Sequence, residues 1–210
     1  DLLRDLETSI NKSFSIKFTD NRKLNNLLKK LHIDLNDEGI EDARMDGNFL
    51  DQLLKIISKL DKLNDLKITS LIYNRNVKSL KLINLKRLTH LDISSSWVDK
   101  LPEDLFKLSK LKVLKMNKLR NVKTIPKEIG NLKNLIELEL KLNKEIEKLP
   151  EEIGNLRNLE ILDLLFCEKL KIFPYQILNL KNLKKLFLPK EMIIEPVFEV
   201  SGGEIGRASC

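Results

Sequence analysis

The sequence predicts an α/β solenoid, with short parallel strands along one face and short helices or turns along the other. An apolar hexad, Leu-x-x-Leu-x-Leu or a close variant, occurs about seven times in the 210 residues. The interval between copies settles at 23 and then 24 residues in the second half of the chain. A constant period in this range indicates stacked coils. The central leucines of the hexads are Leu31, Leu66, Leu91, Leu114, Leu138, Leu162 and Leu186.

Each hexad predicts a short strand with one buried side. Alternate side chains of a strand point to opposite faces, so Leu138 and Leu140 point to the interior while Glu139 between them points to solvent. One such strand cannot bury its apolar side alone, whereas a stack of strands can. We therefore expect about seven strands to form one curved parallel sheet.

Proline marks the outer side of four coils. Pro lacks a backbone donor and suits the start of a helix, so each copy predicts a short outer helix. The segments that follow carry apolar residues at matching places, as in 128–132, 152–156 and 176–180. The apolar–proline pairs are Leu101-Pro102, Ile125-Pro126, Leu149-Pro150 and Phe173-Pro174.

These features resemble the leucine-rich repeat family, in its form L-x-x-L-x-x-L-x-L-x-x-N-x-L-x-x-L-P-x-x-I-x-x-L. The resemblance is strong over residues 85–190 and less regular over 24–84. It implies a solenoid whose concave sheet recognises another protein. The run 162–170 looks like repeats of intracellular immune receptors, and the Glu-Ile-Gly-Asn-Leu blocks look like those of bacterial and protist proteins.

One position departs from the family pattern. The family places Asn or Cys five residues after the central leucine, where it hydrogen-bonds the backbone of neighbouring coils. Two leucines here leave backbone groups that need other partners, because buried backbone groups rarely stay unpaired. In this chain the column reads Asn36, Leu71, Ser96, Leu119, Asn143, Cys167 and Glu191.

The chain divides into five predicted segments. Residues 1–23 form an N-terminal cap of a helix and a short strand, and 24–84 form irregular repeats with one longer helix. Apolar residues of 49–60 fall on one face of that helix, with Asp46 or Asn48 as its N-cap. Residues 85–190 form the regular repeats, 191–200 a C-terminal cap, and 201–210 a loose or appended tail outside the fold.

Composition and motifs favour a non-catalytic, cofactor-free chain. The two histidines, His32 and His90, have no cysteine or carboxylate at metal-ligand spacing, and no phosphate loop or nucleophile motif occurs.

No apolar run reaches the roughly 18 residues of a membrane helix. With only two cysteines, the ends lack cysteine caps, which is compatible with a reducing compartment. We expect a cytoplasmic location, with a secreted or surface protein of a bacterium as the alternative.

An apolar patch is predicted on the open face. It comes from three consecutive coils, and neighbouring strands lie about 4.8 Å apart. Exposed apolar patches of this kind mark partner sites, but the C-terminal cap or a neighbouring domain could also cover it. Its members are Leu142, Ile161, Leu165, Phe166 and Phe187.

A basic patch is predicted beside it. Residues 105–148 hold 12 Lys and Arg against 5 Glu, a balance that equals the net charge of +7 for the whole chain. Such a patch would steer an acidic protein partner toward the chain, although a merely solvated surface is the other interpretation. Nucleic acid is disfavoured because interleaved aromatic residues are missing. Lys115, Lys118 and Lys141 point into the concave face, Arg120 and Lys144 lie at its rim, and Trp97 on the rim is an anchor or packs against a loop.

The sequence therefore predicts a protein–protein recognition module that binds its partner on the concave face. Two alternatives stay open. The repeats could be the substrate-targeting arm of a larger enzyme, such as a ubiquitin-ligase effector, or part of a bacterial surface or adhesion protein.

Overall fold

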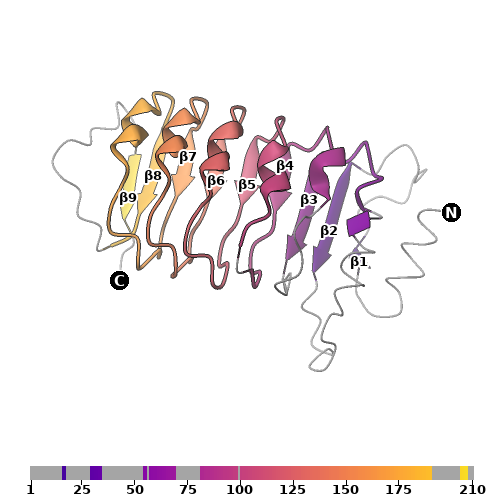
Figure 1. Cartoon of the computed structure of the whole chain (residues 1–210), viewed down its shortest axis with the longest axis horizontal. Coiled ribbons are helices and arrows are strands. Elements are labelled where there is room, and N and C mark those ends of the chain that lie inside the picture. The colour runs from indigo at the N-terminus through magenta and orange to yellow at the C-terminus, as the bar shows by residue number, and fades with distance from the viewer. Residues whose placement is uncertain are drawn as a thin grey trace, which may run out of the picture.

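In the computed structural model, the described residues are 16–17, 29–34, 54–55, 57–69, 81–98, 100–190 and 204–207. They contain one nine-stranded sheet whose strands lie side by side in chain order (Figure 1). Strands β2 to β9 are parallel, and β1 pairs antiparallel with β2. The strands are β1 Ile16–Lys17, β2 Lys30–Asp34, β3 Asp65–Thr69, β4 His90–Asp92, β5 Val113–Lys115, β6 Glu137–Glu139, β7 Ile161–Asp163, β8 Lys185–Leu188 and β9 Glu204–Arg207.

The sheet register confirms the predicted repeat. Each central leucine pairs with that of the next coil, from Leu31 with Leu66 to Leu162 with Leu186. The same register holds in β2 and β3, where the sequence repeat is irregular. It also aligns the solvent-side column between the leucines, which runs His32, Lys67, Asp92, Lys115, Glu139, Asp163 and Phe187.

The core is a continuous stack of these leucines. Leu138, Leu140 and Leu162 are fully buried, whereas Glu139 between two of them is only half-buried. Asp163 differs from the expectation of solvent exposure, because it is 7% exposed. It belongs to the open-face column but is covered there by polar neighbours, which are described below.

Short 3₁₀ helices form the other face, and four of them confirm the role predicted for proline. Each of the four begins directly after a proline in extended conformation, which acts as the N-cap residue. In these turns an N–H bonds three residues back, as from Ile129 N to Pro126 O at 3.1 Å. The helices are η1 Leu82–Asn84, η2 Glu103–Lys107, η3 Lys127–Asn131, η4 Glu151–Asn155 and η5 Tyr175–Asn179.

Glycine allows successive helices to stack closely. A Cβ on Gly154 would lie 2.3 Å from the carbonyl oxygen of Gln176 in η5, so only glycine fits there. The corresponding residue of η5 is Leu178, which is exposed. A further coil therefore cannot approach η5 as closely as η5 approaches η4.

The last described coil is shorter than the others. Leu186 of β8 pairs with Ile205 of β9, nineteen residues later, whereas Leu162 pairs with Leu186, twenty-four residues later. Strand β9 lies inside segment 201–210, which was predicted to be a tail outside the fold. The hexad pattern did not reveal this strand, because Ile205 is followed by Gly206 and Arg207 instead of a second inward leucine.

The structure describes only some of the residues on which the N-terminal predictions fall. Leu54, Lys55 and Ile57 are helical, and Leu54 and Ile57 are buried in the core, in agreement with the apolar face expected over 49–60. The rest of that helix lies outside the described residues. The same holds for the proposed C-terminal cap, 191–200, and for all of 1–23 except the two residues of β1.

Candidate functional site

The turns that follow the strands are fixed by one buried polar side chain. Asn143 Nδ2 donates to Met116 O at 2.7 Å and to Leu140 O at 2.6 Å, and its Oδ1 accepts from Leu119 N at 2.7 Å. These bonds join its own coil to the preceding one, as predicted for this column. Leu119 occupies the same column in the preceding coil but has no polar side chain. Asn143 Oδ1 supplies the acceptor for its backbone N–H.

Two other members of the column also donate side-chain hydrogen bonds to backbone carbonyls. Ser96 Oγ donates to Ile93 O at 2.7 Å, and Cys167 Sγ donates to Leu140 O at 3.1 Å. Burial raises the pKa of the Cys167 thiol to about 12, so this cysteine stays protonated and structural. Asn36, Leu71 and Glu191 lie outside the described residues.

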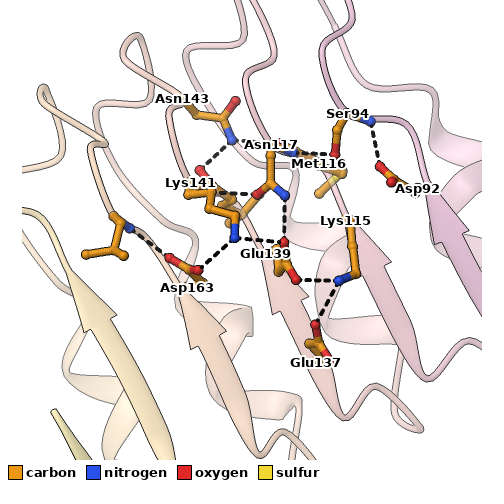
Figure 2. A network of polar contacts seen from close by, with 12 residues as sticks. Asp92, Ser94, Lys115, Met116, Asn117, Glu137, Glu139, Lys141, Asn143 and Asp163 are labelled. Atoms are coloured by element: carbon orange, nitrogen blue, oxygen red, sulfur yellow. Dashed lines mark hydrogen bonds and ion pairs between the residues drawn. The ribbon is translucent and has the colours of Figure 1, made fainter. Parts of the chain in front are cut away.

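An ion network occupies the middle of the concave face (Figure 2). Lys115 Nζ lies 3.2 Å from Glu137 Oε1 and 2.5 Å from Glu139 Oε1. Lys141 Nζ lies 3.3 Å from Glu139 Oε2 and 3.4 Å from Asp163 Oδ2. The network thus crosses strands β5, β6 and β7 and the turn after β6. Asp163 also accepts from Leu165 N at 3.1 Å, and these contacts explain its burial.

Asn117 completes the network, although the repeat pattern does not mark it as a candidate site residue. Its Nδ2 donates to Glu139 Oε2 at 2.6 Å, and its Oδ1 accepts from Lys141 N at 3.0 Å. Its own N–H donates to Ser94 Oγ at 3.0 Å. The signal for this network was the opposite charge of Lys115 and Glu139 in neighbouring coils, since facing residues of paired strands interact.

The network changes the electrostatics of the predicted basic patch. Lys115 and Lys141 face three carboxylates, so the centre of the concave face carries no excess of positive charge. At the rim, Lys144 Nζ lies 2.8 Å from Glu168 Oε1. The guanidinium of Arg120 stacks over the ring of Trp97 at 4.3 Å, and Lys118 is exposed. The structure therefore divides the five predicted cations between an ion-paired centre and a rim.

Titration of Glu139 depends on this network. Burial raises the pKa of Glu139, but hydrogen bonding to Lys115, Glu137 and Asn117 outweighs burial and holds this pKa at about 2. Burial likewise lowers the pKa values of Lys115 and Lys141, and their carboxylate partners raise them to above the ordinary lysine value. All three groups are therefore charged at neutral pH.

We predict that Glu139→Gln removes an acid-sensitive part of the stability. The pKa of Glu139 is lower in the folded than in the unfolded chain, so its contribution is complete above about pH 4.5 and is lost as pH falls to about 2. The contribution is on the order of 2 kcal/mol. Urea denaturation of both proteins between pH 7 and pH 2 measures it. The difference between them should shrink as the pH falls, and a constant difference would contradict the network.

The apolar patch lies beside the network. Leu142 and Phe166 are 40% and 43% exposed, and Ile161, Leu165 and Phe187 are half-buried. Phe187 pairs in register with Asp163, which places it at the edge of the ion network. Binding by the apolar patch and by the basic patch stays a prediction.

A shallow groove lies toward the N-terminal half of the concave face. Its volume is about 190 Å³. His32 Nε2 lies 3.7 Å from Asp65 Oδ1, and Lys67 Nζ lies 3.7 Å from Asp92 Oδ2, so its charges are largely paired. In the described residues, no three His, Cys, Asp or Glu side chains come together as metal ligands would. The groove is lined by His32, Asp65, Lys67, His90, Leu91, Asp92, Val113 and Lys115.

None of the described helices has the length and apolar character needed to span a lipid bilayer.

No protein-family model matches the sequence, and no curated protein matches it significantly. Solved structures are similar in fold. The leucine-rich repeat domain of the type III effector XopL has 24% identity and a TM-score of 0.53 over 63% of this chain and 47% of that one. The Arabidopsis receptor kinase HAESA has 26% identity and a TM-score of 0.53 over 64% of this chain and 23% of that one.

A leucine-rich repeat protein of Leptospira interrogans has 20% identity and a TM-score of 0.57 over 99% of this chain and 57% of that one. The chain thus spans between 23% and 57% of the length of these three proteins. The 24-residue repeat, the parallel register of the central leucines and these structural likenesses agree: the chain is a leucine-rich repeat solenoid.

Proposed function

We propose that this chain is a non-catalytic recognition module that binds another protein on its concave face. The observation that carries the proposal is the apolar patch, in which side chains from three consecutive coils remain partly exposed on a sheet that is otherwise polar. Exposed apolar side chains that gather on one face mark interaction surfaces, and aromatic residues are favoured anchors.

The surroundings of the patch suit recognition. The ion network holds its lysines and carboxylates against one another, so the charged side chains beside the patch are already ordered before a partner arrives. Ordered side chains lower the entropy cost of association. The structure of HAESA was solved in complex with the peptide hormone IDA and the co-receptor SERK1. That complex supports protein or peptide recognition by a chain of this fold.

Replacing Ile161 and Phe187 by serine should weaken partner binding more than about tenfold, because both are central members of the apolar patch. A displayed library of natural protein fragments, selected on the wild-type chain, supplies the binders, and their affinities for both proteins are then measured. The matched control is Ile172→Ser with Tyr175→Ser, which removes two residues outside the open-face columns that are 75% and 73% exposed. Equal affinity loss in the two variants would contradict binding on the concave face.

A further inference from the structure

Five tight turns lead from the 3₁₀ helices into strands β4 to β8, along the edge of the sheet where the strands begin (Figure 1). Each turn is closed by a backbone bond between two buried leucines, as from Leu135 N to Leu132 O at 2.9 Å. The two residues between these leucines are exposed in every turn. The exposed pairs are Lys86-Arg87, Ser109-Lys110, Lys133-Asn134, Arg157-Asn158 and Lys181-Asn182.

The exposed turn residues form a row of positive charge, because six of the ten are cationic and none is acidic. In the part of the chain that the structure describes, the side chains of these six residues take part in no ion pair or hydrogen bond. Glu160, which lies just before β7, is paired with Lys184 at 2.8 Å and does not neutralise the row. The six cations, here called the cationic turn row, are Lys86, Arg87, Lys110, Lys133, Arg157 and Lys181.

The opposite edge, where the strands end, carries charges of both signs. Lys144 Nζ lies 2.8 Å from Glu168 Oε1, and Lys169 Nζ lies 2.6 Å from Glu145 Oε2. Charges that served only solubility would be mixed in this way on both edges. A row of one sign instead attracts a partner of the opposite sign. The contrast between the edges therefore indicates an anionic partner at the cationic turn row.

Asparagine side chains hold the cationic turns in register. Asn158 Nδ2 donates to Lys133 O, and Asn182 Nδ2 donates to Arg157 O, both at 2.8 Å. Asn134 makes the same bond to the turn before it. Two of the three bonds thus tie the backbone of a cationic residue to the next coil. The Oδ1 atoms of these exposed asparagines accept no hydrogen bond from the described chain, so they can accept one from a partner.

The mixture of cations and amides selects the class of partner. The phosphate groups of a polyphosphate or nucleic-acid backbone offer acceptor oxygens only, and these do not pair with an amide oxygen. An extended acidic polypeptide offers carboxylates to the cations and backbone N–H groups to the amide oxygens. Five turns at about 4.8 Å per coil cover about 19 Å, which is the length of about six extended residues at about 3.3 Å each.

We propose that the cationic turn row binds an extended acidic segment of another protein. The segment lies across successive turns, its aspartate or glutamate side chains approach the cations, and its backbone N–H groups donate to the asparagine Oδ1 atoms. The turns lie at the edge of the sheet and not on its concave face. This interaction surface is therefore additional to the one in the proposed function and does not depend on it.

Fluorescence anisotropy of a labelled peptide of about ten residues, in which glutamate alternates with serine, tests the proposal on the whole chain. The affinity is expected to fall about tenfold when Lys133, Arg157 and Lys181 are all changed to glutamine, because half of the cationic turn row is then neutral. The affinity of the wild-type chain should also fall with added salt. Unchanged affinity of the glutamine variant would overturn the proposal.

The matched control removes the same charge elsewhere. Lys118, Lys123 and Lys148 are exposed and lie between the strands and the following 3₁₀ helices. Changing all three to glutamine lowers the net charge by the same amount, and the affinity should stay within about twofold of the wild type. An equal loss in the two triple variants would show that net charge alone attracts the peptide, and the cationic turn row would not be a site.

Altered probes test the chemistry of the partner. A peptide with glutamine in place of glutamate should not bind measurably. A peptide that keeps every carboxylate but has N-methylated backbone amides should bind at least about threefold more weakly, because it cannot donate to the asparagines. Inorganic polyphosphate is the competing probe. If it binds as tightly as the glutamate peptide and N-methylation has no effect, the row accepts any polyanion, and the proposed polypeptide is wrong.

The variant Ile161→Ser with Phe187→Ser keeps this proposal separate from the concave face. It should bind the glutamate peptide as the wild-type chain does. If it loses the peptide while the glutamine variant of the turns keeps it, the peptide binds the concave face. That outcome would overturn the cationic turn row and leave the proposed function standing.

Discussion

Leu162→Asp is expected to abolish the cooperative unfolding transition, because it places a carboxylate in the centre of the stacked core. Leu162 is fully buried, and Leu138 and Leu186 pair with it in the neighbouring coils. An isolated buried charge costs several kcal/mol even after relaxation, and the lost leucine adds about 2–5 kcal/mol. Together these costs approach the 5–15 kcal/mol by which domains are typically stable. Circular dichroism during heating measures the transition.

The matched control changes the preceding residue of the same strand. Ile161 points to the open face, so Ile161→Asp should leave a cooperative transition within a few degrees of the wild type. If Leu162→Asp melted as cooperatively as Ile161→Asp, the inward and outward columns would be exchanged. Such an exchange would move every contact residue proposed on the concave face to the wrong side of the sheet, because a shift by one residue inverts the faces of a strand.

The register was predictable because burial imposes a strict period. Each coil must place its two hexad leucines in the interior, so the sequence repeats them even where the rest of the coil is irregular, as at Leu31 and Leu66. The helices after proline were predictable for a similar reason, since proline fixes the backbone just before each of them. The short final coil was not predictable from the hexads, because Ile205 lacks the second inward leucine.

The contacts of the open-face residues could not be predicted from the sequence, because they depend on side-chain geometry. The sequence predicts that Lys115, Lys141 and Glu139 lie on the open face, and it assigns the two lysines to a basic patch. It did not show that these side chains reach one another, or that Asn117 bonds both Glu139 and the backbone N–H of Lys141. Nor did it show that Leu142 takes a left-handed conformation, because the residue type leucine gives no sign of this backbone state.

Asn143→Ala is expected to lower the free energy of unfolding by about 3–5 kcal/mol, because three buried hydrogen bonds lose their partner at once. Leu119 N, Met116 O and Leu140 O all bond to this side chain. Leu140 O keeps the thiol of Cys167, but Leu119 N has no second acceptor among the contacts described above. The midpoint and slope of urea denaturation measure the loss.

Ser96→Ala provides the comparison for this prediction. Ser96 occupies the same column, and its hydroxyl donates to Ile93 O and Ser94 O of its own coil. Its loss should cost about 1 kcal/mol. The difference between the two variants measures what the two bonds of Asn143 to the preceding coil contribute beyond a hydroxyl in the same column. A leucine at 119 is tolerated only because the next coil supplies an acceptor, so Asn143→Ala destabilises two coils. Equal effects of the two variants would show that the bonds of Asn143 to the preceding coil contribute no more than a hydroxyl does, and the dependence of Leu119 on its neighbour would be wrong.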